Sequence, residues 1–383
     1  MTETLKILNS PLEETQRQLG ATFAERDGWH VPISFGDVRL EYASVRKSGA
    51  GLIDLSSRAR IAVSGTEAVQ FLNGLITNDM KTLAENTWMA AAFPNVQGRL
   101  LASVRVARLQ ENNFLIDTEP ATHEQVLKTI ERFTMAGDFR VTDITSRTAM
   151  LSLQGTDAAV IAGKALQQDL SGVEPKAVAR VSWPEGVDQA ADFSTGLTLL
   201  RATYTAADGF EFIVEADHAV ALWNTLLDAG ATPVGYETLE TLRIEAGLPR
   251  YGVDMDDSNV VTEALFDDAV SYTKGCYLGQ EIIARIKYRG HVAKQLSGIA
   301  FGEAVDLRSG ALVKSEDDKD AGRLTSVTFS PQLERTIALG YLKYDYLAPG
   351  TKVKVAVENG EAIGGVTKLP FIQTASDERS AAD

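Results

Sequence analysis

The octamer IAVSGTEA (Ile61–Ala68) recurs later in the chain as LSLQGTDA (Leu151–Ala158), and this weak repeat is the main guide to the fold. In each copy, alternating apolar residues run up to a glycine, which is typical of a half-buried strand. The threonine after the glycine, Thr66 or Thr156, is expected to cap a following helix that carries regularly spaced apolar residues. Each copy therefore predicts a strand, a turn and a helix.

A second strand and helix follow each copy in the same order. In the first half NFLIDT (Asn113–Thr118) precedes the helical pattern THEQVLKTIERF, and in the second half FEFIVEA (Phe210–Ala216) precedes DHAVALWNTLLDAG. The segments LLASVRVARL, FRVTDI, LTLLRATYT and ATPVG supply the remaining strands. Each half then has the order β-α-β-β-α-β, the split βαβ motif of ferredoxin-like domains. The predicted fold class is α+β with two such units, the alternative being that the octamers are alike by chance.

The chain changes character from about Leu296. Short β-branched segments such as RLTSVTFS and TKVKVAV alternate with Gly, Pro and acidic turns, without helical periodicity. This pattern predicts a small all-β barrel or sandwich. The last residues, TASDERSAAD, are small and polar, which is typical of disordered termini. The predicted domains are residues 1–290 for the α+β region, 291–372 for a β-barrel and 373–383 for a disordered tail.

The composition limits the classes of function. The 383 residues are 44% hydrophobic and 23% charged, as in ordinary globular proteins, and the net charge of −15 disfavours binding to nucleic acid. No segment has the apolar length of a membrane span and the first residues lack a signal-peptide pattern, so we expect a cytoplasmic protein with no membrane partner. The single cysteine, Cys276, excludes an internal disulfide, and the four histidines are far apart, so no metal centre is expected.

The stretch KGCYLGQEIIARIKYRGHVAK (Lys274–Lys294) is the most unusual part of the chain. Gly275 and Gly279 flank the only cysteine, and GQEIIARI predicts a short helix at this point. A thiol just before a helix and among basic residues has more thiolate character, which makes Cys276 a candidate reactive or metal-binding group. The alternative is a buried cysteine that behaves as a small apolar residue.

The same stretch carries five basic residues and one acidic residue, although the chain is acidic overall. Local positive charge indicates an anionic ligand, such as a folate with its glutamate tail, a phosphate or an acidic partner surface. The alternative is a solvated basic face that pairs with surplus carboxylates.

This stretch also resembles a known family signature. KGCYLGQEIIAR, followed by Lys287 and the pair Arg289–Gly290, is similar to the signature of YgfZ-type folate-binding proteins, and PNVQGRLL (Pro94–Leu101) resembles the corresponding loop of those proteins. A wider resemblance, to glycine-cleavage T-proteins, covers most of the chain and includes RATYTAADGFEF and LETLRIEAGLPRYGVDMDD. It implies a ring-like arrangement of three domains with tetrahydrofolate in the central hole.

The resemblance implies the residues of the site as well. Cys276 becomes the candidate functional thiol, and Asn95, Tyr204, Arg243 and Tyr251 become the candidate folate contacts. Their alternative roles are core aromatics, an ion pair on a helix surface and turn chemistry. The signature residues are Lys274, Gly275, Cys276, Gly279, Gln280, Glu281, Arg285, Arg289 and Gly290.

Two departures bear on the branch of the family. T-proteins carry paired aspartates where this chain has Ala102 and Ser103, so a carboxylate that would assist aminomethyl transfer is missing. They carry a glutamate for the pterin ring where this chain has Ala207, with Asp208 one position later. These losses make the chain look closer to the YgfZ branch, which is tied to iron–sulfur enzyme maintenance, than to a working aminomethyltransferase.

Three functions are therefore compared. The leading hypothesis is a tetrahydrofolate-binding accessory protein that supports assembly or repair of iron–sulfur clusters in client enzymes. The alternative is a folate-dependent aminomethyltransferase or other one-carbon transferase. The third is a scaffold that keeps the fold but binds no folate, and a test of tetrahydrofolate binding separates it from the other two.

Overall fold

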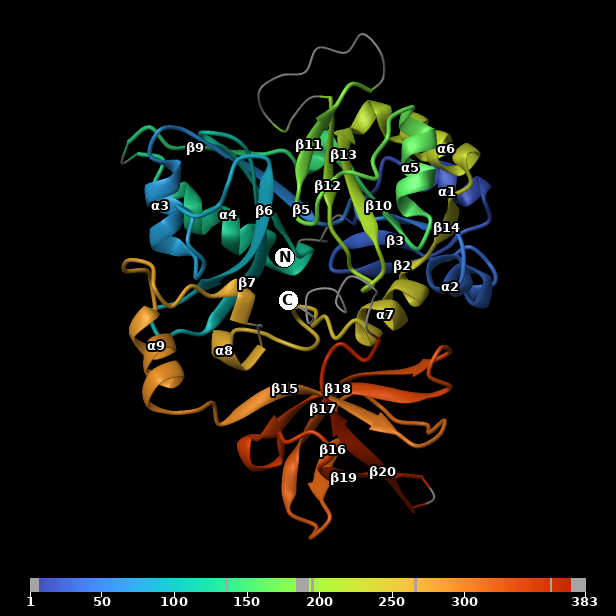
Figure 1. Ribbon diagram of the computed structural model, residues 1–383, viewed down its shortest axis with the longest axis vertical. Helices are drawn as coiled ribbons and strands as arrows, with labels where there is room; N and C mark the ends of the chain where they lie inside the picture. The colour runs from blue at the N-terminus through green and yellow to red at the C-terminus, as the bar shows by residue number, and fades with distance from the viewer. Residues whose placement is uncertain are drawn as a thin grey trace, which may run out of the picture.

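Two α+β regions and a β-barrel make up the protein (Figure 1). The tail predicted at 373–383 lies outside the part of the chain that can be described. No helix in the described part is long and apolar enough to cross a membrane. The computed structural model describes residues 7–135, 137–183, 193, 196–264, 267–358 and 360–372.

The first repeat forms a five-stranded antiparallel sheet in the order β6-β7-β8-β5-β9. Apart from the edge strand β6, the last strand of the unit lies beside the first, as in a split βαβ motif. Helices α3 and α4 pack on one face of this sheet. The elements are β5 (Ala59–Ser64), α3 (Ala68–Leu75), β6 (Thr87–Pro94), β7 (Leu100–Gln110), β8 (Asn113–Thr118), η1 (Pro120–Thr122), α4 (His123–Glu131), β9 (Arg140–Asp143) and η2 (Thr145–Arg147).

The second repeat forms a six-stranded sheet in the order β11-β12-β13-β10-β4-β14. The predicted fourth strand, ATPVG, forms β14 (Thr232–Val234), but it does not lie beside β10, the first strand of the unit. Strand β4 (Gly51–Asp54), which comes before both repeats, takes that place and pairs with both neighbours. The second unit is therefore a split βαβ motif in which one extra strand, β4, is inserted between the first and last strands. Its other elements are β10 (Thr148–Gln154), α5 (Ala158–Leu166), β11 (Val178–Val181), β12 (Leu197–Arg201), β13 (Gly209–Glu215), η3 (Ala216–His218) and α6 (Ala219–Ala229).

The two sheets pack face to face because their strands are apolar on both sides. In β8, Phe114 packs with helices α3 and α4, whereas Leu115 packs in the layer between the sheets. In β13, Phe212 packs with α5 and α6, whereas Ile213 belongs to the middle layer. Successive strand residues point to opposite faces, so both faces bury side chains. All seven residues of β10 are buried, where the sequence pattern predicted a half-buried strand.

The threonines of the repeat do not cap the helices as predicted. Helices α3 and α5 begin without a side-chain cap hydrogen bond. The Thr66 hydroxyl donates instead to Asp138 Oδ2 at 3.1 Å. The glycine before it has a structural reason, because a Cβ on Gly65 would lie 2.1 Å from the Asp138 carbonyl oxygen. The glycine and threonine of the first octamer therefore form a tight turn and do not cap the helix.

A small three-stranded sheet and helix α7 (Tyr236–Glu245) join the two α+β regions to the barrel. The small sheet has the order β1-β3-β2. Helix α7 contacts β3 and α2 on one side and the barrel strands β17 and β18 on the other. The N-terminal elements are β1 (Leu8–Asn9), α1 (Glu13–Gln18), β2 (Thr22–Arg26), β3 (Trp29–Ser34) and α2 (Val38–Arg46).

The C-terminal strands close into a barrel in the order β15-β18-β17-β16-β19-β20, with an interior of aliphatic side chains around Phe301. The predicted α+β class and the predicted barrel are thus confirmed. The segment between α7 and the barrel carries α8 (Val261–Ala264), η4 (Asp267–Ala269) and α9 (Gln280–Arg289), the last being the helix predicted from GQEIIARI. The barrel elements are β15 (Lys294–Phe301), β16 (Leu312–Ser315), β17 (Asp320–Ser330), β18 (Arg335–Lys343), η5 (Tyr344–Tyr346), β19 (Lys352–Val357) and β20 (Gly360–Thr367).

Candidate functional site

A cavity of about 300 Å³ lies where the two α+β regions meet helix α7 and the segment that follows it. This volume is at the lower end of ordinary small-molecule sites. Aromatic rings, arginines and carboxylates share its lining. The lining residues are Arg26, Asp27, Val31, Leu55, Ser57, Arg58, Trp88, Ala90, Ser103, Val104, Arg105, Glu119, Pro120, Thr203, Tyr204, Tyr236, Leu239, Glu240, Arg243, Leu248, Pro249, Arg250, Met255, Asp268 and Ala269.

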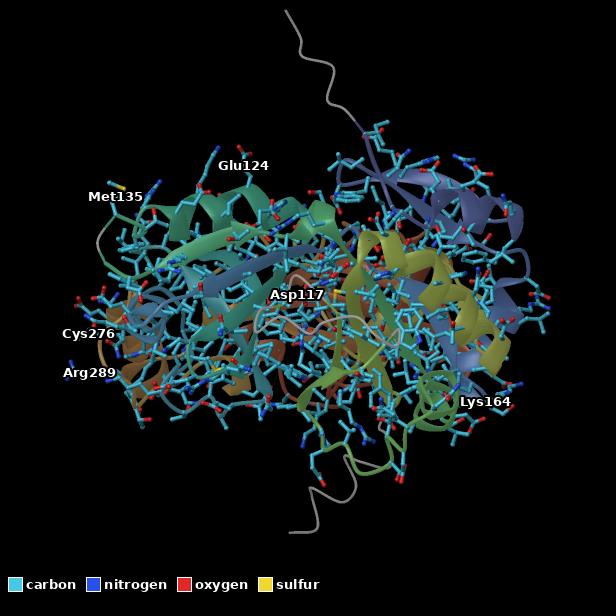
Figure 2. All side chains as sticks on the ribbon, turned by 90° about the horizontal axis from the view of Figure 1, so that it is seen from above. Asp117, Glu124, Met135, Lys164, Cys276 and Arg289 are labelled. Atoms are coloured by element: carbon cyan, nitrogen blue, oxygen red, sulfur yellow. The ribbon has the colours of Figure 1, made fainter. Side chains whose placement is uncertain are left out.

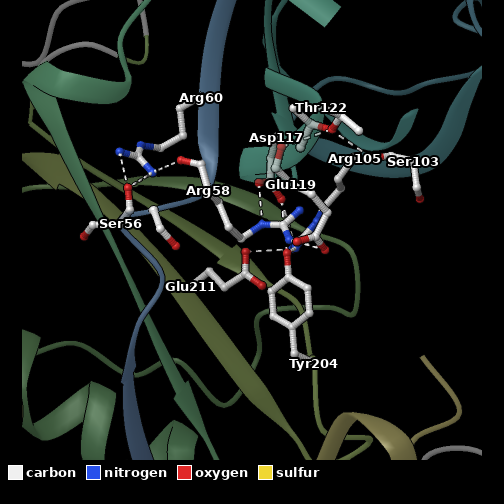
Figure 3. Close-up of polar contacts among 12 residues, drawn as sticks. Ser56, Arg58, Arg60, Ser103, Arg105, Asp117, Glu119, Thr122, Tyr204 and Glu211 are labelled. Atoms are coloured by element: carbon white, nitrogen blue, oxygen red, sulfur yellow. Dashed lines mark hydrogen bonds and ion pairs between the residues drawn. The ribbon is translucent and has the colours of Figure 1, made fainter. Parts of the chain in front are cut away.

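A buried cluster of charged and hydroxyl groups lies beside the cavity (Figure 3). Arg105 and Tyr204 line the cavity, whereas Asp117 and Glu211 lie behind the lining. Arg105 of β7 donates from Nη1 to Glu211 of β13 at 2.7 Å and so links the two sheets. Asp117 of β8 stands opposite Arg105 in the register of its sheet and accepts from Arg58 Nε at 2.7 Å. The Tyr204 hydroxyl donates to Asp117 Oδ2 at 3.2 Å and accepts a hydrogen bond from Arg105. The cluster therefore joins the first sheet to the second through side chains.

The alternation of strand side chains places this cluster. Asp117 lies two residues after Leu115, and Glu211 lies two residues before Ile213. Both apolar residues belong to the layer between the sheets. Because residues two apart share a face of a strand, the charged groups continue the same layer. The middle layer thus changes from apolar to charged at the end where the cavity lies.

Burial and pairing set the protonation of the cluster. Burial by itself raises the pKa of Asp117, but Arg58 and Arg105 outweigh it, so the pKa of this carboxyl is lowered. Burial raises the pKa of Glu211 despite the pull of Arg105, and Glu211 Oε1 is buried without a partner among the described residues. Burial also raises the pKa of Tyr204, so its hydroxyl stays protonated. A hydroxyl donor in the lining therefore stands next to a fixed carboxylate behind it.

Two of the four predicted folate contacts, Tyr204 and Arg243, line the cavity. The alternative role predicted for Arg243 was an ion pair on a helix surface. Arg243 does pair with Glu240, but only 6% of the Arg243 surface is exposed, so this arginine is buried. Its Nη1 also lies 2.7 Å from Asp254 Oδ2. Both residues are therefore placed where they could contact a ligand, and that contact stays a prediction.

The other two predicted contacts, Asn95 and Tyr251, do not line the cavity. Asn95 closes a turn, because its Oδ1 accepts from the backbone N–H groups of Gln97 at 2.8 Å and Arg99 at 3.0 Å. Tyr251 packs at the edge of an apolar cluster that contains Met255, and burial raises its pKa. Turn chemistry and core packing account for the positions of both side chains.

The loop PNVQGRLL and the signature stretch pack on each other. A Cβ on Gly279 would lie 2.4 Å from the Asn95 carbonyl oxygen and 3.0 Å from Gly98 Cα. Gly279 also has a φ of 77°, a left-handed conformation that glycine adopts without strain. Helix α9 begins at the next residue, and its Ile283 lies over Gly98. A backbone contact inside the protein therefore explains this signature glycine.

Lys274 ties the signature stretch to the first α+β region. The buried ammonium group donates to the carbonyl oxygens of Asn73 at 2.7 Å, Ile76 at 2.9 Å and Asn78 at 2.6 Å. These carbonyls lie at and after the end of helix α3, where carbonyl groups lack helical partners. Burial lowers the pKa of Lys274 to about 8, although the charge of Asp79 opposes this shift. A structural role accounts for all of these contacts.

Cys276 is exposed, so it is not the buried apolar cysteine of the alternative interpretation. It lies at the outer edge of the molecule, well away from Asp117 (Figure 2). None of the residues 274–294 lines the cavity, so the basic residues of this stretch, from which an anionic ligand was predicted, do not face it. The remaining signature residues lie on this outer side: Gly275, Glu281, Arg285, Arg289 and Gly290 are exposed, and Gln280 donates to the Lys274 carbonyl oxygen at 3.4 Å.

The two positions where T-proteins carry acidic residues lie differently with respect to the cavity. Ser103 lines the cavity, whereas Ala102 faces the core under helices α3 and α4. Ala207 packs on the layer between the sheets and does not line the cavity. Asp208 Oδ2 accepts from Arg201 Nη2 at 2.9 Å and is committed to that pair. Asp208 therefore does not take the place of the missing glutamate in this cavity.

The charged cluster itself was not predicted from the sequence. Arg58, Arg105, Asp117 and Glu119 are the missed residues, and Glu119 accepts from Arg58 Nη1 at 2.9 Å. For Arg105 and Asp117 the available signal was a charged residue within a strand that is otherwise apolar on both faces, whereas Arg58 and Glu119 lie just outside the ends of β5 and β8. Arginines neutralise these carboxylates, and no group of three or more His, Cys, Asp or Glu suited to a metal ion occurs among the described residues.

The fold and cavity define an α+β protein with a C-terminal barrel and a polar central site. Residues 12–274 match the family described as GCVT N-terminal domain, and residues 294–373 match the glycine cleavage T-protein C-terminal barrel domain. The chain therefore belongs to the glycine cleavage T-protein family.

Relatives and a solved structure agree with this membership. An aminomethyltransferase of Shouchella clausii is 32% identical over 371 residues, which cover 96% of this chain and 98% of the relative. An aminomethyltransferase of Geobacillus kaustophilus is 31% identical over 373 residues, covering 96% and 99%. The crystal structure of glycine cleavage system aminomethyltransferase T from Bartonella henselae shares the fold, with a TM-score of 0.87, 24% identity and coverage of 96% and 98%. These relatives support the family and not the predicted placement in the YgfZ branch.

Replacement of Gly279 by alanine should destabilise the protein. The left-handed backbone alone costs about 1–3 kcal/mol for a residue with a Cβ, and the contact with the Asn95 carbonyl oxygen adds to this cost. Thermal unfolding should show a clear fall in Tm. Gly275→Ala is the matched control, because a Cβ at Gly275 would meet no atom within 4 Å. Equal Tm values for the two variants would contradict this assignment.

Replacement of Lys274 by methionine should lower the free energy of unfolding by about 1–3 kcal/mol at pH 7, because buried carbonyl groups lose their donor. The pKa of Lys274 is about 8 in the folded protein and 10.5 in its ordinary state. Between these values the unfolded chain binds more protons, so the stability of the wild type relative to Lys274→Met should rise as the pH increases. Urea unfolding of both proteins from pH 7 to 10.5 measures this difference, and a flat or falling difference would argue against a lowered pKa of Lys274.

Proposed function

We propose that this chain binds tetrahydrofolate in the cavity and acts as a folate-dependent one-carbon transferase of the aminomethyltransferase type. The observation that carries the proposal is the cavity between the α+β regions and α7, with its mixture of aromatic rings, arginines and carboxylates. Membership of the T-protein family and relatives named aminomethyltransferases over nearly the whole chain support it. The ring-like arrangement around folate, implied by the resemblance, belongs to the same proposal.

The lining offers groups for both ends of a folate. Tyr204 and Tyr236 provide flat apolar surface for a pterin ring. Glu119 uses Oε1 for Arg58, and its Oε2, which has no hydrogen bond among the described residues, can accept from ring N–H groups. Near α7, Arg250 lies 3.6 Å from Asp27 and 3.7 Å from Glu240 in two long ion pairs, and its Nε makes no hydrogen bond among the described residues, so it can still donate to a carboxylate of the ligand. An acceptor without a hydrogen bond and a donor without a hydrogen bond thus both belong to the lining.

Transfer of a one-carbon unit to or from tetrahydrofolate requires control of the proton on the folate nitrogen. The Ser103 hydroxyl lines the cavity but carries no charge, so it cannot act as the carboxylate of other T-proteins. Asp117 supplies a fixed negative charge behind the lining, and Tyr204, which lines the cavity, donates its hydroxyl to this carboxylate. In this proposal Tyr204 positions the substrate, and Asp117 acts on it electrostatically.

A cavity-filling substitution tests the location of binding. Ala90 of β6 lines the cavity, so Ala90→Trp should reduce the affinity for tetrahydrofolate at least tenfold because the indole occupies the ligand's space. Isothermal titration calorimetry measures the affinity, and formation of methylene-folate from candidate donors measures transfer. Ala24→Trp, at an exposed strand position, is the matched control. Undiminished binding by a folded Ala90→Trp variant would place the ligand elsewhere, and absence of wild-type binding would favour the scaffold without folate.

One observation favours a second function for the same chain. Cys276 is the only cysteine, it is exposed, and it comes shortly before helix α9, which carries the exposed basic side chains of Arg285 and Arg289. An accessible thiol outside the cavity suits contact with another protein better than catalysis within the cavity. We propose as the second candidate the YgfZ-like accessory role in assembly or repair of iron–sulfur clusters in client enzymes.

The variant Cys276→Ser separates the two functions. If the thiol serves client enzymes, cells carrying this variant should lose activity of cluster-containing enzymes under oxidative stress, whereas the purified variant should bind tetrahydrofolate like the wild type. Enzyme assays in stressed cells and calorimetry measure these outcomes. Full activity of the cluster-containing enzymes, at equal protein abundance, would count against the accessory role.

A further inference from the structure

The loop that carries Tyr204 is held by buried polar side chains from outside the loop. It comprises residues 202–208, which lie between β12 and β13 and have no regular secondary structure. Connecting loops are usually the more mobile parts of a protein surface. We propose that Gln154 and Arg46 are positioning residues, which fix this loop so that the Tyr204 hydroxyl meets Asp117 beside the cavity. This inference rests on the proposed function and adds two residues to it.

The two repeats differ at this loop. In the first repeat, residues 111 and 112 connect β7 with β8, whereas in the second repeat the longer loop 202–208 connects the corresponding strands. The residue before the octamer glycine also differs, being Ser64 in the first repeat and Gln154 in the second. Each of the two lies opposite the first residue of the strand that follows the connection. The long amide side chain thus occurs in the repeat that has a long loop to hold.

Gln154 is fully buried, and its amide uses all of its hydrogen-bonding positions. Its Oε1 accepts from Tyr204 N and from Thr205 Oγ1, both at 3.2 Å. Its Nε2 donates to the Ala202 carbonyl oxygen at 3.1 Å and to Ser152 Oγ at 2.9 Å. Rotation of the amide by a half turn would set its NH₂ group against the Tyr204 N–H group, so these partners allow one orientation. Gln154 therefore holds the loop backbone at Ala202 and at Tyr204.

Arg46 of α2 holds the next residue of the loop. Its Nη1 donates to the Thr205 carbonyl oxygen at 2.6 Å, and its Nε and Nη2 donate to Glu245 Oε2 at 2.8 and 2.7 Å. Both side chains of this ion pair are buried. The other oxygen of Glu245 accepts from the hydroxyl groups of Tyr42 and Ser330. Movement of Arg46 would leave a buried carboxylate short of donors, so the arginine is itself held in place.

The contacts of Tyr204 depend on this support. Its hydroxyl donates to Asp117 at 3.2 Å and accepts from Arg105, and both partners belong to the other large sheet (Figure 3). A loop displacement of about 1 Å would break a hydrogen bond of this length. Neither Gln154 nor Arg46 lines the cavity. Their loss should therefore affect a ligand through Tyr204 and not through contacts of their own.

Calorimetry with tetrahydrofolate tests this dependence in a cycle of variants of the full chain. Gln154→Met and Tyr204→Phe should each weaken binding about tenfold, as expected for the loss of one buried hydrogen bond. The double variant should bind no more weakly than the weaker single variant, because the hydroxyl that Tyr204→Phe removes is already misplaced.

The matched control is Gln16→Met. Gln16 is also fully buried, but its amide donates to Asp54 and not to the loop. This variant should change the affinity by less than about twofold, and its effect should multiply with that of Tyr204→Phe, as for independent sites.

Fluorine NMR of 3-fluorotyrosine incorporated at position 204 gives a readout that needs no ligand. Gln154→Met should shift or split this resonance, whereas Gln16→Met should leave it unchanged. Arg46→Lys keeps a positive charge near Glu245 but lacks the planar fork that also reaches the Thr205 carbonyl oxygen. This second variant should therefore change the resonance too, even where Gln154→Met does not fold.

The outcomes separate this inference from the proposed function. If the wild type binds no tetrahydrofolate, the proposed function fails, and the fluorine resonance still decides whether Gln154 and Arg46 fix Tyr204. A resonance that is unchanged in the folded variants would overturn the inference even where folate binds. Effects of Gln154→Met and Tyr204→Phe that multiply in the double variant would show that Gln154 only supports the fold, and would overturn it as well.

Discussion

The structure depends on the matching of charges that are buried between the two sheets. Arg105 bonds to Glu211 of the facing sheet and stands opposite Asp117 in its own sheet. An ion moved from water into a protein interior costs several kcal/mol, and loss of one partner of a buried pair costs about 3–5 kcal/mol. A shift in register of either sheet would leave one of these charges unpaired. The cluster therefore specifies how the two sheets face each other, whether or not it adds to the net stability.

The cavity follows from the same change in the middle layer. Aliphatic side chains fill the space between the sheets where Leu115 and Ile213 meet, and arginines and carboxylates take over at the other end. Helix α7 closes that end through its own charged side chains. Glu240 pairs with Arg26, Arg243 with Asp254, and Glu245 accepts from Arg46 of α2 and Ser330 of the barrel. Polar groups surround the space on several sides, so it is suited to a ligand with charged ends.

The order of strands and helices could be predicted because repeated apolar patterns and glycine turns are local features. The place of β4 could not, because a strand of four residues far from its partners carries no information about its neighbours. Tyr204 and Arg243 were found through resemblance to a family. Arg105 and Asp117 were missed because strands assumed to be half-buried would turn their charged residues to solvent. Because both faces of these strands are buried, their charged residues point into the protein and not to solvent.

The signature stretch shows why residue type alone does not identify a ligand site. A glycine permits close approach of any backbone, and at Gly279 the approaching backbone is the protein's own loop at Asn95. A buried lysine needs hydrogen-bond acceptors, whether a ligand or the protein supplies them. For Lys274 the acceptors are carbonyl oxygens at the end of α3. Both features would look the same in the sequence if a ligand supplied the contacts. Only the position of the stretch relative to the cavity distinguishes the two cases.

The barrel supports the site from outside the cavity lining, and Asp254 makes this connection. The buried Asp254 carboxylate accepts hydrogen bonds from Arg243, which lines the cavity, and from the hydroxyl groups of Thr325 and Ser326 on the barrel. One anion therefore fixes the positions of all three side chains. Movement of the barrel away from α7 would remove two donors from Asp254 and weaken its hold on Arg243. Because Arg243 lines the cavity, its placement depends on a strand more than 80 positions later in the chain. The N-terminal region and the barrel of this chain are thus coupled through the Asp254 side chain, which accepts hydrogen bonds from both.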